Sequence, residues 1–261
     1  MRCPSPLQFF LIICLLFPWI ALGRVGAQEY NPLVYENLNI EIELDGDGSA
    51  TFTIHVVLRN DGRVPVVPGY GMIVVGGVAQ RRVLGLPLPG SSPQNVSLEI
   101  LYGKDLTRGT EIEVVPLPGE NGSVKVRYSL WQPLRPGQSE EFVFSFTVHN
   151  AVATGVLFDE FSLEIGPFSS DVERGSLKII PPSGTKITYV SPRPSSLSGS
   201  VEWQIDGLKS GTPITIQVEL SSLPLPTLPA RGYMLVWGAA ILVLLTLIAR
   251  RLLMRKEGGG P

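Results

Sequence analysis

Apolar and polar residues alternate at every second position in the middle of the chain. The pattern is regular over residues 50–59 and over residues 142–148. The apolar positions are Phe52, Ile54, Val56 and Leu58 in the first segment, and Phe142, Phe144, Phe146 and Val148 in the second. A period of two places alternate side chains on opposite faces of a strand. Each segment therefore predicts a strand with one face on a core and one face toward water.

Shorter segments of strand-forming residues surround these two and are separated by Gly, Pro, Asn and Asp. They cover residues 38–44, 71–75, 82–86, 96–101, 110–115, 123–130, 156–165, 176–180, 186–190, 201–205 and 212–220. No useful helical period lies between them, and this spacing is typical of β-sandwiches. We therefore predict an all-β fold of one or two Ig-like antiparallel β-sandwiches.

The division of these strands into domains is less strongly specified by the pattern. A boundary near Asn150 gives a first β-sandwich domain over residues 28–150 and a smaller β-domain over residues 151–220. In the alternative, residues 158–165 complete the first sandwich. Residues 221–231 carry three prolines after the last strand and predict an extended, semi-rigid stalk.

The two ends of the chain carry uncharged apolar runs. The run at residues 7–22 follows Arg2 and leads to small residues, which predicts a secretory signal peptide over residues 1–27, cut after Ala27 or after Gly23. A retained N-terminal anchor is the alternative. The run at residues 232–249 would form a helix about 27 Å long, close to the hydrocarbon thickness of a bilayer. It predicts a C-terminal transmembrane helix.

The residues that flank the second run predict how it would lie in a membrane. Basic residues follow it, and aromatic and basic residues lie near its beginning. The predicted anchor flanks are Arg231, Tyr233, Trp237, Arg250, Arg251, Arg255 and Lys256. By the positive-inside rule, residues 250–261 would be a basic cytoplasmic tail and the N-terminus would lie outside. The expectation is a single-pass cell-membrane protein that contacts lipid through this helix.

Composition changes the picture chiefly through charge. Charged residues make up only 17% of the 261-residue chain, and the formal net charge is −2. Residues 28–230, however, hold 22 acidic and 14 basic residues, a net charge of −8. An acidic surface repels phosphate backbones, so the sequence argues against a nucleic-acid partner.

The sequence shows no motif for catalysis, a metal or a cofactor. Cys3 and Cys14 both lie in the predicted signal peptide, and His55 and His149 lie on polar strand faces without a triad or metal spacing. The segment 45–48, Asp-Gly-Asp-Gly, predicts a hairpin turn in preference to a calcium loop. We therefore expect a protein that is not an enzyme and that needs no metal or cofactor.

Acidic pairs are the remaining candidates for chemistry. The pairs at 140–141 and 159–160 predict solvated strand ends. A hydrolase would instead require a buried cluster of Asp159, Glu160 and Asp171 with raised pKa values. Two N-glycosylation sequons, at Asn95 and Asn121, lie beside predicted turns and predict a glycoprotein.

One apolar loop is a candidate for contact with a partner. Residues 64–72 are apolar and punctuated by Pro and Gly, and an exposed patch of that kind marks an interaction site. This interpretation assigns Val67, Tyr70 and Met72 to a protein or envelope partner. The alternative is a crossover between sheets whose side chains face the core.

The segment around the alternating Phe strand carries a family resemblance. The run Leu134-Arg135-Pro136-Gly137-Gln138-Ser139, ahead of the strand, resembles a hairpin of CARDB-like and S-layer-associated β-sandwich domains in archaeal and bacterial surface proteins. The later strand Val201-Glu202-Trp203 is similar in style. The resemblance implies a surface β-sandwich and assigns no active residues.

Together these patterns predict a non-enzymatic, single-pass cell-surface protein. Its extracellular β-sandwich would serve binding or envelope structure. The alternative is an accessory subunit of a membrane enzyme or transporter complex. In that case Gly238, Ala239 and Ala240 would give the C-terminal helix a small-residue face for a partner helix.

Overall fold

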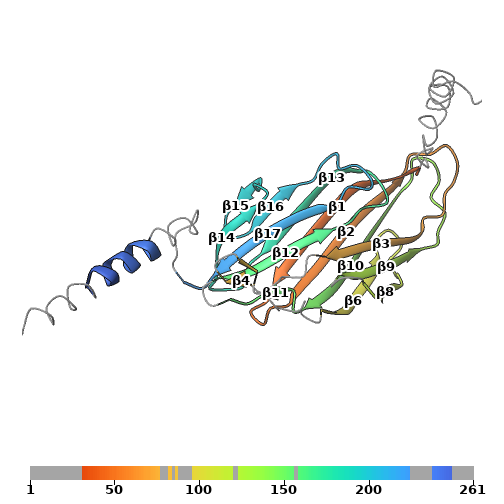
Figure 1. The fold of residues 1–261 in the computed structure, drawn as a ribbon. Helices are drawn as coiled ribbons and strands as arrows, with labels where there is room; N and C mark the ends of the chain where they lie inside the picture. The colour runs from red at the N-terminus through yellow and green to blue at the C-terminus, as the bar shows by residue number, and fades with distance from the viewer. Residues whose placement is uncertain are drawn as a thin grey trace, which may run out of the picture. The chain divides into compact units, whose positions relative to one another are not determined.

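The fold is built almost entirely of β-strands (Figure 1). The structure is a computed structural model that describes residues 31–76, 82–83, 86–87, 96–119, 123–155, 158–223 and 237–248. Within these ranges the strands form one eight-stranded sheet, one seven-stranded sheet and a separate two-stranded ribbon. The predicted β-rich fold is therefore confirmed.

The first sheet has eight strands, with β1 and β2 near its centre. In spatial order these are β15 (Ser196–Leu197), β16 (Val201–Gln204), β13 (Val172–Ile180), β1 (Leu33–Leu44), β2 (Ala50–Asn60), β10 (Ser139–His149), β6 (Ser97–Asp105) and β7 (Thr110–Glu111). The segment 45–48 joins β1 to β2, and Gly48 N donates to Asp45 O at 3.1 Å. The hairpin turn predicted there is confirmed.

The second sheet has seven strands. Six follow in the order β14 (Lys186–Ser191), β17 (Ile214–Ser221), β12 (Asp159–Ile165), β3 (Gly69–Gly76), β9 (Val124–Leu130) and β8 (Val114–Leu117). The seventh, β11 (Val152–Ala153), pairs with β12. The ribbon consists of β4 (Arg82–Val83) and β5 (Leu86–Pro87).

The two alternating segments lie side by side in the first sheet, as β2 and β10. Their register places Phe52 opposite Phe146, and the two rings stack with centroids 4.9 Å apart. Phe142, Phe144 and Phe146 are fully buried. The period of two therefore correctly marks which side chains enter the core.

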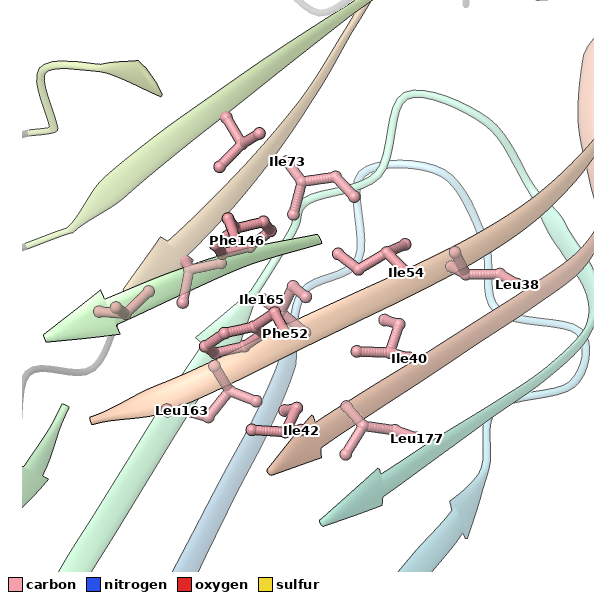
Figure 2. Close-up of a cluster of buried hydrophobic side chains, with 14 of the residues drawn as sticks. Leu38, Ile40, Ile42, Phe52, Ile54, Ile73, Phe146, Leu163, Ile165 and Leu177 are labelled. Atoms are coloured by element: carbon pink, nitrogen blue, oxygen red, sulfur yellow. The ribbon is translucent and has the colours of Figure 1, made fainter. Parts of the chain in front are cut away.

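The second sheet covers this apolar face. Figure 2 shows side chains of β1 and β2 gathered with Ile73, Leu163 and Ile165 of the second sheet in one cluster. At another point of the core, Tyr128 of β9 packs on Phe142 and Phe144, with ring centroids 5.1 Å and 5.3 Å away. Its hydroxyl lies 3.0 Å from that of Tyr35 on β1. The two sheets thus form a sandwich around one shared core.

The halves of the chain on either side of Asn150 contribute to both sheets. β13 pairs with β1, and β12 pairs with β3. Asn150 has a φ of 58° and turns the chain from β10 in the first sheet to β11 in the second. The position predicted as a domain boundary is therefore a crossover between the layers of one sandwich. The all-antiparallel prediction is also wrong, because β1 and β13 run parallel.

The predicted C-terminal transmembrane helix is not found. The structure describes residues 237–248 of the segment predicted to span, and these residues are helical. Among the residues that the structure describes, no helix is long and apolar enough to cross a membrane. The predictions of lipid contact through this helix and of a single-pass membrane location are therefore wrong.

Several predictions concern residues outside the described ranges. They are the signal peptide over residues 1–27, most of the stalk over residues 221–231 and the basic tail over residues 250–261. The signal-peptide assignment gains no support from the structure.

Candidate binding site at one end of the sandwich

An aromatic surface lies where β3 begins and β9 ends. We use this name for Tyr70, Met72 and Trp131, whose side chains are all exposed, Tyr70 by 57% and Trp131 by 56%. The two rings meet edge to face with centroids 4.8 Å apart. The Arg127 guanidinium lies 4.6 Å from the centroid of the Tyr70 ring, in a cation–π contact.

Strand alternation explains why these side chains face outward. In β3, Tyr70 and Met72 are exposed and Ile73 is buried. Gly71 lies between Tyr70 and Met72 and pairs with Tyr128 of β9. A Cβ on Gly71 would lie 2.0 Å from the Tyr128 ring. The tyrosine that fills the core therefore requires a glycine at this place in β3.

A buried asparagine holds the loops beside the aromatic surface. Asn60 Nδ2 donates to Val64 O at 2.9 Å and to Leu134 O at 2.8 Å. Val66 and Leu134 exchange backbone hydrogen bonds of 3.0 Å and 2.8 Å. These bonds tie the segment before β3 to the segment after β9, and so fix where Tyr70 and Trp131 stand.

A polar cleft of about 230 Å³ opens beside Trp131. Its charged and aromatic lining residues are Asp105, Arg108, Glu111, Glu113, Trp131 and Glu140. Trp131 thus belongs both to the aromatic surface and to the wall of the cleft. The two features form one continuous candidate site.

Two buried carboxyl groups share one guanidinium in this cleft. Arg108 Nη1 donates to Glu140 Oε1, and it lies 3.4 Å from Asp105 Oδ2. Asp105 Oδ1 accepts the backbone N–H of Arg108 at 3.0 Å, which fixes the turn after β6. Burial, and next the neighbouring Asp105 carboxyl, raise the pKa of Glu140 to about 7, and Arg108 offsets part of that rise.

The position of Glu140 follows from the alternation that places the Phe side chains in the core. Counting back by two from Phe142 reaches Glu140, which is only 1% exposed. Asp105 lies opposite Phe142 in the β6–β10 register, on the same face. The prediction of two solvated carboxylates is therefore right for Glu141, which is exposed, and wrong for Glu140. Extending the period by one step would have identified Glu140.

The structure places all three residues predicted to contact a partner at the surface. Val67 is 49% exposed and Met72 45% exposed. The alternative is therefore right that this segment crosses between the sheets, from β2 to β3, and wrong that these side chains face the core. Contact with a partner stays a prediction. The sequence interpretation missed Trp131, whose signal is a large aromatic directly after the end of the β9 alternation.

Each histidine considered for catalysis contacts a carboxylate, and His149 Nδ1 also lies 3.1 Å from Ser49 Oγ. His55 Nε2 lies 2.8 Å from Glu141, and His149 Nε2 lies 3.5 Å from Glu99. Gln217 Nε2 donates to Glu160 Oε1 at 2.7 Å.

Asp171 has separate partners. Its side chain accepts hydrogen bonds from Lys209 and the Ser210 backbone, both of which lower its pKa. The raised pKa that the hydrolase alternative requires is therefore not found at Asp171. In the described ranges, no three His, Cys, Asp or Glu side chains are grouped to hold a metal.

The remaining predicted sites fall mostly outside the described residues. These are Asn95, Asn121, Arg231, Tyr233, Arg250, Arg251, Arg255 and Lys256. Trp237 is described, in the helix over residues 237–248, and is exposed.

Comparisons with known proteins identify relatives but no family. No family model matches the chain. An uncharacterized protein of Methanocaldococcus jannaschii is 26% identical over 132 residues, which cover 51% of this chain and 90% of that protein. The resemblance to CARDB-like domains is not addressed by this relative and stays a prediction.

Solved structures show distant likeness. An M1 zinc metallopeptidase of Deinococcus radiodurans matches with a TM-score of 0.37 and 9% identity, covering 74% of this chain and 43% of its own. A candidate nutrient-binding protein of Legionella pneumophila matches with a TM-score of 0.43 and 9% identity, covering 72% and 67%. The chain thus spans well under half the length of the metallopeptidase.

Proposed function

We propose that this chain is a non-enzymatic binding protein whose β-sandwich contacts a protein partner through the aromatic surface. The observation that carries the proposal is the exposed Tyr70–Trp131 pair, with Arg127 stacked on it. The few residues that carry most of the binding energy at protein interfaces are enriched in Tyr, Trp and Arg. Exposed apolar clusters on folded domains are typical of contact sites.

The rigid support of the surface favours binding further. The backbone hydrogen bonds between Val66 and Leu134, and those of Asn60, hold both loops in place before any partner arrives. A surface that is already ordered loses less conformational entropy on association.

The test is retention of a partner by the full chain in affinity capture, followed by reconstitution with the purified partner. Tyr70→Ala and Trp131→Ala are expected to weaken the complex at least about tenfold, the scale of interface hot spots. Leu197→Ala is the matched control, because Leu197 is also an exposed apolar residue but lies on β15 of the other sheet. Wild-type complex formation after Tyr70→Ala, Val67→Ser and Trp131→Ala would refute the proposal.

A further inference from the structure

The cleft beside Trp131 has more negative than positive groups. Four carboxyl groups line it, and Arg108 is its only cationic side chain among the described lining residues. Arg108 is already shared between Asp105 and Glu140, which are 2% and 1% exposed. One guanidinium cannot neutralise both carboxylates of this pair, so the cleft has an unmet requirement for positive charge.

A second observation locates that requirement at one atom. Glu140 Oε2 is buried and has no hydrogen-bond partner among the described residues, although Glu140 lines the cleft. Leaving a buried acceptor without a donor costs about 1–3 kcal/mol, and more when it is charged. Burial, and next the Asp105 carboxyl, raise the pKa of Glu140 to about 7, so this carboxyl can hold a proton near neutral pH. A ligand that brings a positively charged donor would take the place of that proton.

The walls of the cleft indicate the form of the donor. Trp131 lines the same cleft as the carboxyl groups, and the face of an indole attracts a cation. The adjoining Tyr70 ring already holds the Arg127 guanidinium in this way. A volume of about 230 Å³ accommodates the end of one long side chain. A metal ion is not indicated, because the described residues offer no group of three or more ligands and Arg108 lies between the two buried carboxyls.

We propose that the cleft receives a lysine or arginine side chain of the protein that binds the aromatic surface. The cationic end would donate to Glu140 and stack on Trp131, while apolar residues beside it would cover Tyr70 and Met72. This inference rests on the proposed function and specifies the chemistry of the partner. It predicts a basic residue flanked by apolar residues at the centre of the partner's contact segment.

The first test uses small probes in place of the partner. Nα-acetyl-L-arginine amide and its uncharged counterpart Nα-acetyl-L-citrulline amide are titrated into the full chain, with Trp131 indole and backbone shifts followed by NMR. We expect saturable binding of the arginine probe with a Kd of about 1–10 mM, and binding of the citrulline probe at least about tenfold weaker. The shifts are expected to centre on Trp131 and Arg108.

Variants separate the cleft from general surface charge. Glu140→Gln is expected to weaken the arginine probe about fivefold or more, since it removes one charge and keeps the shape. Glu164 is an exposed residue of β12 that pairs with Gly76, six residues after Tyr70 in β3. Glu164→Gln removes one charge far from the cleft along this strand and is expected to leave binding unchanged. Glu111→Gln, on the exposed rim of the cleft, is expected to have a smaller effect than Glu140→Gln.

The outcomes distinguish this inference from the function on which it rests. Equal binding of the two probes, no binding up to about 50 mM, or an unchanged Kd in Glu140→Gln would overturn the basic-side-chain inference. In that event a partner complex that is still lost in Tyr70→Ala would leave the proposed function intact. If the purified chain self-associates and Tyr70→Ala abolishes this, the aromatic surface binds a second copy. That result would also overturn the inference, unless the self-association requires a basic residue of the second copy.

Discussion

The two ends of the inward face of β10 have equal burial and opposite chemistry. Phe142, Phe144 and Phe146 are packed among aromatic rings of both sheets, where the hydroxyls of Tyr35 and Tyr128 pair with each other. Glu140 continues the same face and is just as inaccessible, yet it ends in a carboxyl group beside a second carboxyl and an open cleft.

Burial contributes to stability with opposite sign in these two regions. Burial of an apolar ring stabilises the folded state. Burial of a carboxylate destabilises it through lost hydration, and one shared guanidinium offsets only part of that loss. The Phe region can therefore be explained by stability alone. The Glu140 region cannot, and this difference is why we assign binding to that end of the sandwich.

The largest effect is expected from opening the apolar region. Phe144→Ala removes a fully buried ring that packs on Tyr128, Phe142 and Phe146, and should lower the free energy of unfolding by about 3–5 kcal/mol. Denaturant titration followed by circular dichroism measures the change. A loss below about 1 kcal/mol would mean that this region is not a close-packed core.

The polar region should instead respond to pH. Burial and Asp105 raise the pKa of Glu140 from 4.5 to about 7, so the folded chain holds this proton more tightly than the unfolded chain. Between these values unfolding releases the proton, and stability falls as the pH rises, by up to about 3 kcal/mol in total. Melting temperatures recorded from pH 4.5 to 8 test this. The slope should flatten in Glu140→Gln and persist in Glu164→Gln.

The apolar region is also sensitive to added volume where Gly71 of β3 faces Tyr128. Gly71→Ala would push a Cβ to within 2.0 Å of the Tyr128 ring and should cost about 2 kcal/mol through overpacking. Gly46→Ala is the matched control, since nothing lies within 4 Å of its added Cβ. Equal unfolding midpoints for the two variants would contradict the close approach of Gly71 to Tyr128.

The smallest change in stability is expected on the aromatic surface. Tyr70 is exposed and its ring contacts lie at the surface. Tyr70→Ala should therefore change the free energy of unfolding by no more than about 0.5 kcal/mol, while it weakens partner binding. Thermal unfolding and partner binding measured on the same preparation separate the two effects. A large loss of stability would show that Tyr70 serves the fold.

Local patterns in the sequence predicted the central strands well. The segments 50–59 and 142–148 lie within β2 and β10, and their buried faces match the alternation. The C-terminal prediction, which rested on the apolar character of residues 232–249 and on the basic and aromatic residues that flank them, is wrong. In the part of the chain that the structure describes, no helix is long and apolar enough to cross a membrane.

The candidate site was only partly visible in the sequence. Tyr70 and Met72 stood out as apolar residues in a loop, but their neighbours Trp131 and Arg127 lie about 60 positions later in the chain. Glu140 was treated as an ordinary charged residue at a strand end. Its burial follows from extending the alternation of β10 by one step, but its closeness to Asp105 and Arg108 does not follow from positions in the chain.

The sequence by itself determined the β-rich fold, the faces of its main strands and the hairpin turn between β1 and β2. These follow from alternation and turn chemistry, which act between residues close in the chain. Only the tertiary structure decided that β13 lies parallel to β1, that one sandwich spans Asn150, and that Trp131 adjoins Glu140. Such pairings depend on which distant strands share one core, and that is settled by the packing of the whole chain.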